Sequence, residues 1–323
     1  MSQHLPFVME QIYDRPHAIA VSKAQMIVAA LSGRLDVRSL MSEFGALDER
    51  GMRDLAEMGR MEAMIGHNSR EAADKDRPSL SEAQAELRYF DGEPYRLTPS
   101  GIAIIPVKGT LKRSWGIGPF SGSTGYDGIW TQMLHAEENE AVKAMWFDVN
   151  SGGGTTDGLF DLTDAIFENS ARFGGKRKVA MCADFSASAA YAISAACDEV
   201  YTPELGMVGS IGCLIIHAEM TAALEEDGIS VKIFRSRDRK ARGGPLEKLD
   251  EKTAKKLQDM VDEADAVFTR QVGIYRPQLT ENVVSELDGD VYTGRRALAT
   301  GLIDAVKSEP AAWMELEQQI AAR

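Results

Sequence analysis

The sequence contains few of the residues that mark metal-binding, disulfide-rich or haem-type proteins. It has three cysteines and five histidines in 323 residues, and only 7% of its residues are aromatic. Cys182, Cys197 and Cys213 have neither metal-ligand spacing nor the spacing of a disulfide framework, and they lie in apolar runs. We therefore expect buried free thiols in a reducing compartment, with no metal and no cofactor.

Long apolar runs and an excess of positive charge are also missing. No stretch approaches the ~18 apolar residues that a membrane-spanning helix needs. The first residues lack the basic and apolar regions of a signal peptide. The net charge of −13 argues against general binding to nucleic acid and against attraction to anionic lipid. The composition predicts a globular cytoplasmic protein that acts on neither nucleic acid nor membranes.

The pattern of the chain divides it into three parts. Residues 1–62 are predicted to form a helical extension, and residues 63–94 are polar and indicate a linker or exposed arm. In residues 95–323, short β-rich runs alternate with helical segments, which predicts an α/β domain with parallel strands. Residues 250–275 have apolar positions at helical spacing and predict one long amphipathic helix.

Small residues follow three of the predicted strands. The first such loop, "SGGGTTDG", contains Gly153 and Gly154, whose backbone N–H groups at a helix start would stabilise an anion. A phosphate-binding loop would continue with a Lys-Ser/Thr pair, which is absent here. A tight turn without a chemical role explains the glycines equally well. Because open α/β folds bind ligands at the carboxyl ends of their strands, the loops remain candidates for a site.

The second loop, "SASAAYAIS", places Ser188 near the first turn of a helix among alanines. Helix packing is the commoner reason for such small residues, but they would also leave room for a peptide bound as an added strand. A nucleophilic serine needs a base. His217 is near the predicted core, and the basic run "FRSRDRKARGGP" supplies Lys240. Neighbouring cations and burial both favour the neutral form of a lysine, which can accept a proton.

These segments, in this order, resemble the motifs of the signal-peptide-peptidase family of serine proteases. Ala189 and Ala190 replace the glycines of its Ser-Gly-Gly-Tyr segment, and Gly152 replaces the proline of its Ser-Pro-Gly-Gly loop. "VGSIGCLIIH" resembles its Gly-Ser-Ile/Leu-Gly strand, and the basic run resembles its lysine loop. "YDRPHAIAVSKAQMIVAALSGRL", "SGSTGYDGIW" and "GGP" are similar to segments of phage head maturation proteases of the minor capsid protein C type.

The resemblance implies an α/β fold of the Clp protease/crotonase type, a spiral of β-β-α units that assembles into homo-oligomers. It implies endoproteolysis by a Ser–Lys dyad, with Ser188 as nucleophile, Lys240 as base and Ser210 orienting the lysine. The residues whose backbone N–H groups would form the oxyanion hole are Gly153, Gly154 and Ala189. The residues that would line the substrate groove are Ala187, Ala190, Tyr191 and Gly209.

The same resemblance implies a place and partners for this activity. The substrates would be scaffold, capsid and portal-type proteins, and the location would be the host cytoplasm within phage proheads. Four alternatives stay open: a cytosolic homologue that degrades peptides, a Ser–His protease with His217 as base, a crotonase-type acyl-CoA enzyme, and a catalytically inactive capsid-assembly protein on the same fold.

Overall fold

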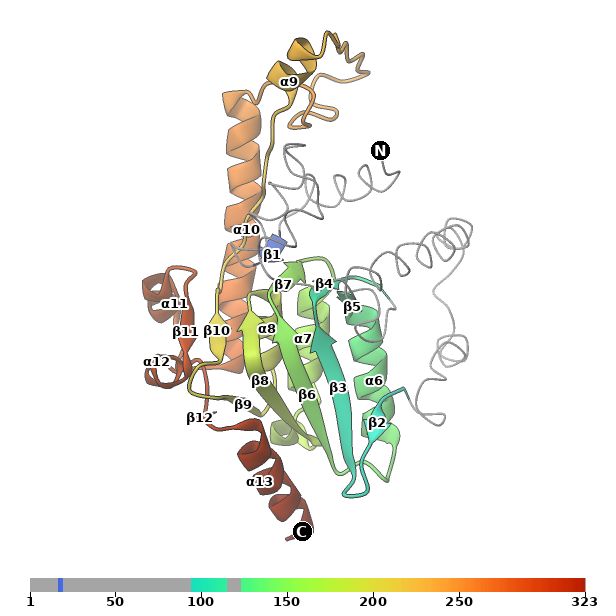
Figure 1. Ribbon diagram of the computed structural model, residues 1–323, viewed down its shortest axis with the longest axis vertical. Helices are drawn as coiled ribbons and strands as arrows, with labels where there is room; N and C mark the ends of the chain where they lie inside the picture. Colours follow the sequence, from blue (N-terminus) through green and yellow to red (C-terminus); the bar gives the residue numbers. More distant parts are fainter. Residues whose placement is uncertain (1–16, 20–93, 115–122, 323) are drawn as a thin grey trace.

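The computed structural model describes residues 17–19, 94–114 and 123–322 (Figure 1). The predicted helical extension and the predicted polar linker therefore lie almost entirely outside the described residues. Three residues of the extension are described, and His17–Ile19 form a strand, β1, where a helix was expected. β1 pairs with a strand far away in the sequence, so tertiary pairing has decided its conformation.

A mostly parallel sheet forms the centre of the domain (Figure 1). Its middle strands are β3 (Ile102–Lys108), β6 (Ala144–Ser151) and β8 (Arg177–Ala187), and β6 pairs in parallel with both of the others. Their nearly continuous apolar runs suit strands that are buried on both faces. The shorter strands of this sheet are β2 (Arg96–Leu97), β9 (Glu199–Thr202), β10 (Met207–Gly209), β11 (Val291–Thr293) and β12 (Ala305–Val306).

A second, smaller sheet lies beyond the carboxyl ends of the central strands (Figure 1). Its strand order is β1-β7-β4-β5, with β4 at Thr110–Lys112, β5 at Ser123–Gly125 and β7 at Gly153–Thr155. β3 leads into β4, β6 leads into β7, and a helix follows each of these pairs along the chain. The β-β-α units predicted for this fold class are therefore present.

Helices cover both faces of the large sheet. On one face, α6, α7, α8 and the C-terminal part of α10 enclose the main core, and on the other α13 packs its Trp313 ring edge-on against Trp146 at 5.1 Å. The helices are α6 (Tyr126–Glu138), α7 (Leu159–Glu168), α8 (Ala189–Ala195), α9 (Thr221–Glu226), α10 (Glu251–Tyr275), α11 (Glu281–Leu287), α12 (Gly294–Ala299) and α13 (Glu309–Ala321), with a 3-10 turn at Ala171–Phe173. None of these described helices is long and apolar enough to cross a membrane.

The three cysteines are free, as predicted. Cys182 and Cys197 are fully buried, and Cys213 is half-buried. Burial, with a smaller contribution from the Asp265 carboxylate, raises the pKa of the Cys213 thiol to about 12. A thiol with so high a pKa is a poor nucleophile at neutral pH, so the serines are the better candidates for a nucleophile.

The long helix predicted over residues 250–275 is α10, and it begins one residue later. The Asp250 carboxylate caps it by accepting the N–H of Thr253 at 2.8 Å. The C-terminal part is anchored in the core by Phe268, Val272 and Tyr275, whereas the N-terminal part extends beyond the sheets (Figure 1). The chain that leads to it, residues 213–249, lies along and around this free end and is called the projecting segment below.

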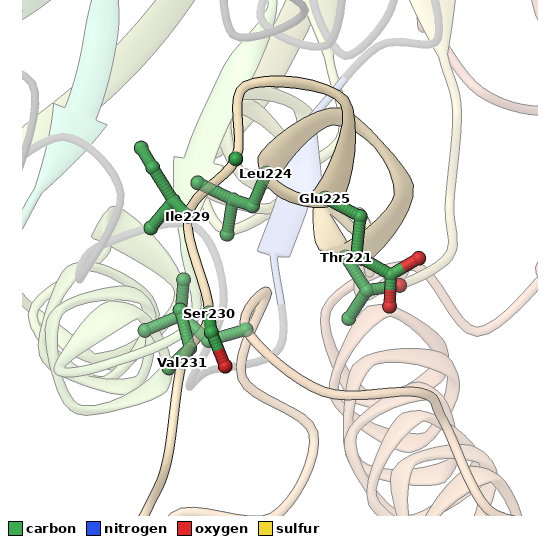
Figure 2. A pocket seen from close by; sticks show the side chains of 8 residues that line it. Thr221, Leu224, Glu225, Ile229, Ser230 and Val231 are labelled. Atoms are coloured by element: carbon green, nitrogen blue, oxygen red, sulfur yellow. The ribbon is translucent and has the colours of Figure 1, made fainter.

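The projecting segment differs from the prediction. "ISVKIFRS" has the alternation of a strand, but these residues have no ladder partner among the described strands. Their apolar side chains are exposed, and Phe234 is 91% accessible. Figure 2 shows Leu224, Ile229 and Val231 around an open hollow of about 350 Å³ on the same segment. Because no strand in the described part of the chain pairs with it, this β-type sequence stays irregular.

Candidate active site

The three small-residue loops, which contain Gly153, Ser188 and Ser210 (the last in "GMVGSIG", residues 206–212), meet at one end of the large sheet, as the sequence predicts. Strands β6, β8 and β10 are neighbours and run parallel, and both Ser151 and Val208 are in register with Ser186. Gly153, Ser188 and Ser210 each lie two residues beyond these paired positions on β6, β8 and β10. The loops therefore leave the sheet at the same level, side by side.

Ser188 occupies a sharp turn between β8 and α8. Its φ and ψ are 59° and −123°, a backbone conformation that costs a residue with a side chain roughly 1–3 kcal/mol. The turn is held because the Ser188 N–H donates to the Gly209 carbonyl at 2.8 Å. The hydroxyl donates to the Gly212 carbonyl at 3.4 Å, a long bond that leaves it weakly engaged. The serine is 1% exposed, so the turn presents a buried, loosely held hydroxyl.

Backbone strain marks the candidate loops more generally. Among the described residues, four that are not glycine have a positive φ: Ser188, Ser210, Ala241 and Asp288. Two of them are the serines assigned from the resemblance, and a third follows Lys240 directly. Such strain persists where the surrounding structure enforces it, and it gathers at functional sites. The distribution supports the choice of these loops without depending on their sequence motifs.

The strain at Ser188 allows a prediction that separates stability from chemistry. Ser188→Gly and Ser188→Ala both remove the hydroxyl, but only glycine relaxes the positive φ. We expect the free energy of unfolding to be about 1 kcal/mol higher for the glycine variant than for the alanine variant. Urea denaturation of the two proteins measures this difference. Equal midpoints would show that the turn is unstrained.

Ser186, in contrast, belongs to the core. Its hydroxyl shares a hydrogen bond of 2.9 Å with Ser194, whose hydroxyl donates to the Ala190 carbonyl at 3.1 Å. Ser186 is also fully buried. A serine whose hydroxyl is already paired inside the core is a packing residue, so Ser188 is the one nucleophile candidate of this loop.

The predicted oxyanion-hole donors have different positions. Ala189 is the first residue of α8, where the N–H has no partner within the helix, and no side chain caps it. The Gly153 N–H already donates to the Ser151 hydroxyl at 3.1 Å. Gly154 lies within β7, where a Cβ would stand 1.7 Å from the carbonyl oxygen of Leu111. The free donor is therefore at Ala189, whereas the two glycines serve the small sheet.

The residues expected to line the substrate groove are placed in the core instead. Ala187, Ala190 and Tyr191 are completely buried, and the Tyr191 hydroxyl donates to the Leu302 carbonyl at 2.9 Å. Gly209, with φ of 122°, holds the Ser188 turn through its carbonyl. The small residues of α8 let this short helix pack closely against strands β6 to β9 and helices α7 and α10. The packing explanation is the one that the structure supports for them.

Lys240 lies in the projecting segment, exposed, on a turn in which its N–H donates to the Arg237 carbonyl at 3.1 Å. The Arg235 guanidinium donates to the Lys240 carbonyl at 2.7 Å and pairs with Glu247. Arg242 pairs with the same glutamate and with Asp238. This network of ion pairs fixes the shape of the loop, and it pairs two of the arginines near Lys240 with carboxylates.

Within one chain, the two predicted dyad residues are apart. The two residues lie beside different parts of α10. Gly212, whose carbonyl accepts the Ser188 hydroxyl, is next to Asp265 of this helix, whereas Gly243, three residues after Lys240, is next to Thr253. From Thr253 to Asp265 the helix rises about 18 Å. His217 is no closer substitute, because its Nδ1 is 2.9 Å from the Gly243 carbonyl, within the projecting segment.

Sequence reasoning missed Asp265. Its Oδ1 would lie 3.7 Å from a Cβ at Gly212, beside the loop that accepts the Ser188 hydroxyl. Burial, and then the nearby Asp262 carboxylate, raises the pKa of Asp265. In the sequence it is one of many acidic residues on a long amphipathic helix, so nothing distinguishes it. No group of residues suited to hold a metal ion occurs in the part of the chain that the structure describes.

The fold and the strained serine define an α/β protein with a buried hydroxyl at a strand-to-helix turn, and comparisons with known proteins show what it is similar to. Residues 171–323 match the family model of peptidase family S49. The chain is 27% identical to capsid assembly protease C of Escherichia phage lambda over 323 residues, which cover 99% of this chain and 67% of that protein. It is 32% identical to head-tail preconnector protein GP5 of Enterobacteria phage P21 over 212 residues, 65% of this chain and 41% of that protein.

The resemblance stated from the motifs is therefore confirmed: the chain is similar to the S49 peptidases over its C-terminal part and to two phage proteins, one of them a capsid assembly protease. It spans about two thirds of the lambda protein and less than half of the P21 protein. Among solved structures, an enoyl-CoA hydratase from Shewanella pealeana matches with 11% identity and a TM-score of 0.42, covering 76% of this chain and 79% of that one.

Proposed function

We propose that this protein is a serine endopeptidase that processes scaffold, capsid and portal-type proteins inside phage proheads in the host cytoplasm. The observation that carries the proposal is the strained, buried Ser188 at the N-terminus of α8, with a free N–H beside it. The similarity to peptidase family S49 and to the two phage proteins supports the reaction class and the setting.

The chemistry follows from these groups. The Ser188 oxygen attacks the substrate carbonyl, and its proton passes to the neutral amine of Lys240. The Ala189 N–H stabilises the negative oxygen that forms, with the positive end of the α8 dipole behind it. Lys240 then protonates the departing amine, which leaves an acyl-enzyme. Water, deprotonated by the same lysine, releases the acid and restores the serine. The Ser210 hydroxyl, on the neighbouring strained turn, orients the lysine amine.

Lys240 has to reach Ser188 from another copy of the chain. The projecting segment holds Lys240 near the far end of α10, about 18 Å along the helix from the nucleophile. The same segment exposes Ile229, Val231 and Ile233 at alternate positions, as in a strand, but it pairs with none of the described strands. A second copy of the chain, with a net charge of −13, would attract the basic run of this segment. An apolar, strand-forming and basic surface is suited to pairing with a second copy.

The function is tested by co-expressing the chain with the capsid and scaffold proteins encoded beside it. We expect processing by the unmodified chain and by Ser186→Ala, the matched control for a serine two residues away. Ser188→Ala should lose at least about 10⁴-fold in rate. A serine-directed fluorophosphonate should label the first two proteins and fail to label Ser188→Ala. Equal processing by Ser188→Ala would refute the assignment.

A further inference from the structure

The outer edge of β7 is occupied by a piece of the chain's own N-terminal part. β1 pairs with β7 in antiparallel register, with His17 opposite Thr155, Ala18 opposite Gly154 and Ile19 opposite Gly153. The other edge of β7 pairs with β4. In the sheet order β1-β7-β4-β5, β1 is therefore the terminal strand, and it covers backbone groups of β7 that would otherwise be unpaired (Figure 1).

This edge lies beside the nucleophile. β7 begins two residues after Ser151, which is in register with Ser186 just before Ser188, and β7 packs against α8. Gly153 and Gly154 carry no side chains, so the backbone edge is unobstructed. In the observed register, β1 runs from Thr155 toward Gly153, that is, toward the loop beside Ser188. A peptide bound in this way would lead its backbone into the candidate site.

The attachment of β1 is also of a kind that can be displaced. Among the described strands, its three residues pair on one side only, with β7, and 74 residues of sequence separate it from the next described segment. A short edge strand of this size adds little stability of its own. An extended protein substrate would make the same backbone hydrogen bonds and add side-chain contacts along its length.

We propose that residues 17–19 are an intramolecular stand-in for the substrate: they occupy the peptide-docking edge of β7, and a protein substrate binds by displacing them. The inference rests on the proposed function, because it assigns the displaced strand's position to the peptide that Ser188 cleaves. The consequence is autoinhibition, since the apparent affinity for a peptide falls by the fraction of molecules in which the edge is free.

The test uses the full chain carrying Ser188→Ala, so that binding is measured without hydrolysis. The probe is a fluorescent synthetic peptide with the sequence of residues 14–21. Because antiparallel strands bond through alternate residues, one of Ala18→Pro and Ile19→Pro removes a ladder hydrogen bond of β1. In that variant we expect the peptide to bind at least about five-fold more tightly. Before peptide is added, the amide hydrogens of β7 should exchange faster.

Two controls keep the result specific, and one further variant covers the case in which the proline variants do not fold. Ala18→Ser keeps the N–H and should bind the peptide as the parent does. The same peptide methylated on the backbone nitrogens that correspond to Ala18 and Ile19 should gain nothing from the proline. Ala18→Gly, which weakens a strand without removing a donor, replaces the proline variants if they fail to fold, and is expected to shift binding in the same direction.

The outcomes separate the two proposals. Unchanged peptide affinity and unchanged exchange of β7 in the folded variants would overturn the inference, even if Ser188-dependent hydrolysis is found. Tighter binding in the proline variant establishes the occupied edge, even if the chain carrying Ser188 hydrolyses nothing, and in that case the proposed function alone fails.

Discussion

Mixing equal amounts of Ser188→Ala and Lys240→Met chains is expected to restore about a quarter of the parental peptidase activity, although each variant alone is inactive. The reason is that Lys240 is held away from the serine of its own chain, so a working site needs Ser188 from one copy and Lys240 from another. In a randomly mixed assembly, half of the serines and half of the lysines are intact, and the two choices are independent. The measurement is the rate of peptide hydrolysis after the mixed chains are unfolded and refolded together.

Two outcomes of the mixing experiment would contradict a site shared between copies. If Lys240 reached Ser188 within one chain by a movement of the projecting segment, no mixture of the two variants would contain an intact site, and activity would stay at the background. If Lys240→Met alone kept full activity, the lysine would not be the base. His217→Ala would then be the next variant to measure.

The role of Lys240 is separated from that of its basic neighbours by matched variants in the same turn. Lys240→Arg keeps the positive charge but cannot lose its proton, so it should be as inactive as Lys240→Met. Arg239→Met removes a charge beside it and should keep most of the activity. Activity kept by Lys240→Arg but lost in Arg239→Met would indicate that the basic segment acts as a docking surface through its charge rather than through one amine.

Much of the fold was predictable because local pattern and tertiary structure agree there. The apolar runs that became β3, β6 and β8 are long enough to be buried on both faces, and the spacing over residues 250–275 gave α10 within one residue. The site loops were predictable for the same reason: each follows a central or neighbouring strand, and parallel strands bring their carboxyl ends together.

The remaining errors have a common physical origin, which is that sequence does not show what a segment meets in space. Ala190 was assigned to a groove because small residues leave room, but in the structure it is completely buried in the main core. The segment from Ile229 to Ser236 has a strand's alternation, yet it pairs with none of the described strands. Residues 17–19 lie in a part of the sequence that predicts a helix, but they form a strand because they pair with the edge of β7.

The second large effect is on stability, at the anchor of α10. The Arg276 guanidinium, 2% exposed, follows the last residue of the helix and binds both carboxylate oxygens of Asp304 at 2.9 Å. Asp304 also accepts the Val200 N–H at 2.7 Å, so it ties the helix end to β9. Asp304→Asn would leave the buried cation without a counter-charge, and we expect the free energy of unfolding to fall by about 3 kcal/mol.

The matched control is Arg295→Ala, which breaks a bidentate ion pair with Glu204 that is mostly exposed to solvent, and which should cost less than about 1 kcal/mol. Urea denaturation followed by circular dichroism measures both, and the slopes should match so that midpoints can be compared. Equal losses in the two variants would show that the Arg276 pair is not an anchor. Because α10 carries the projecting segment, a loosened anchor should also reduce the activity regained by mixing Ser188→Ala and Lys240→Met chains. The position of Lys240 relative to a neighbouring copy depends on the direction in which this helix leaves the core.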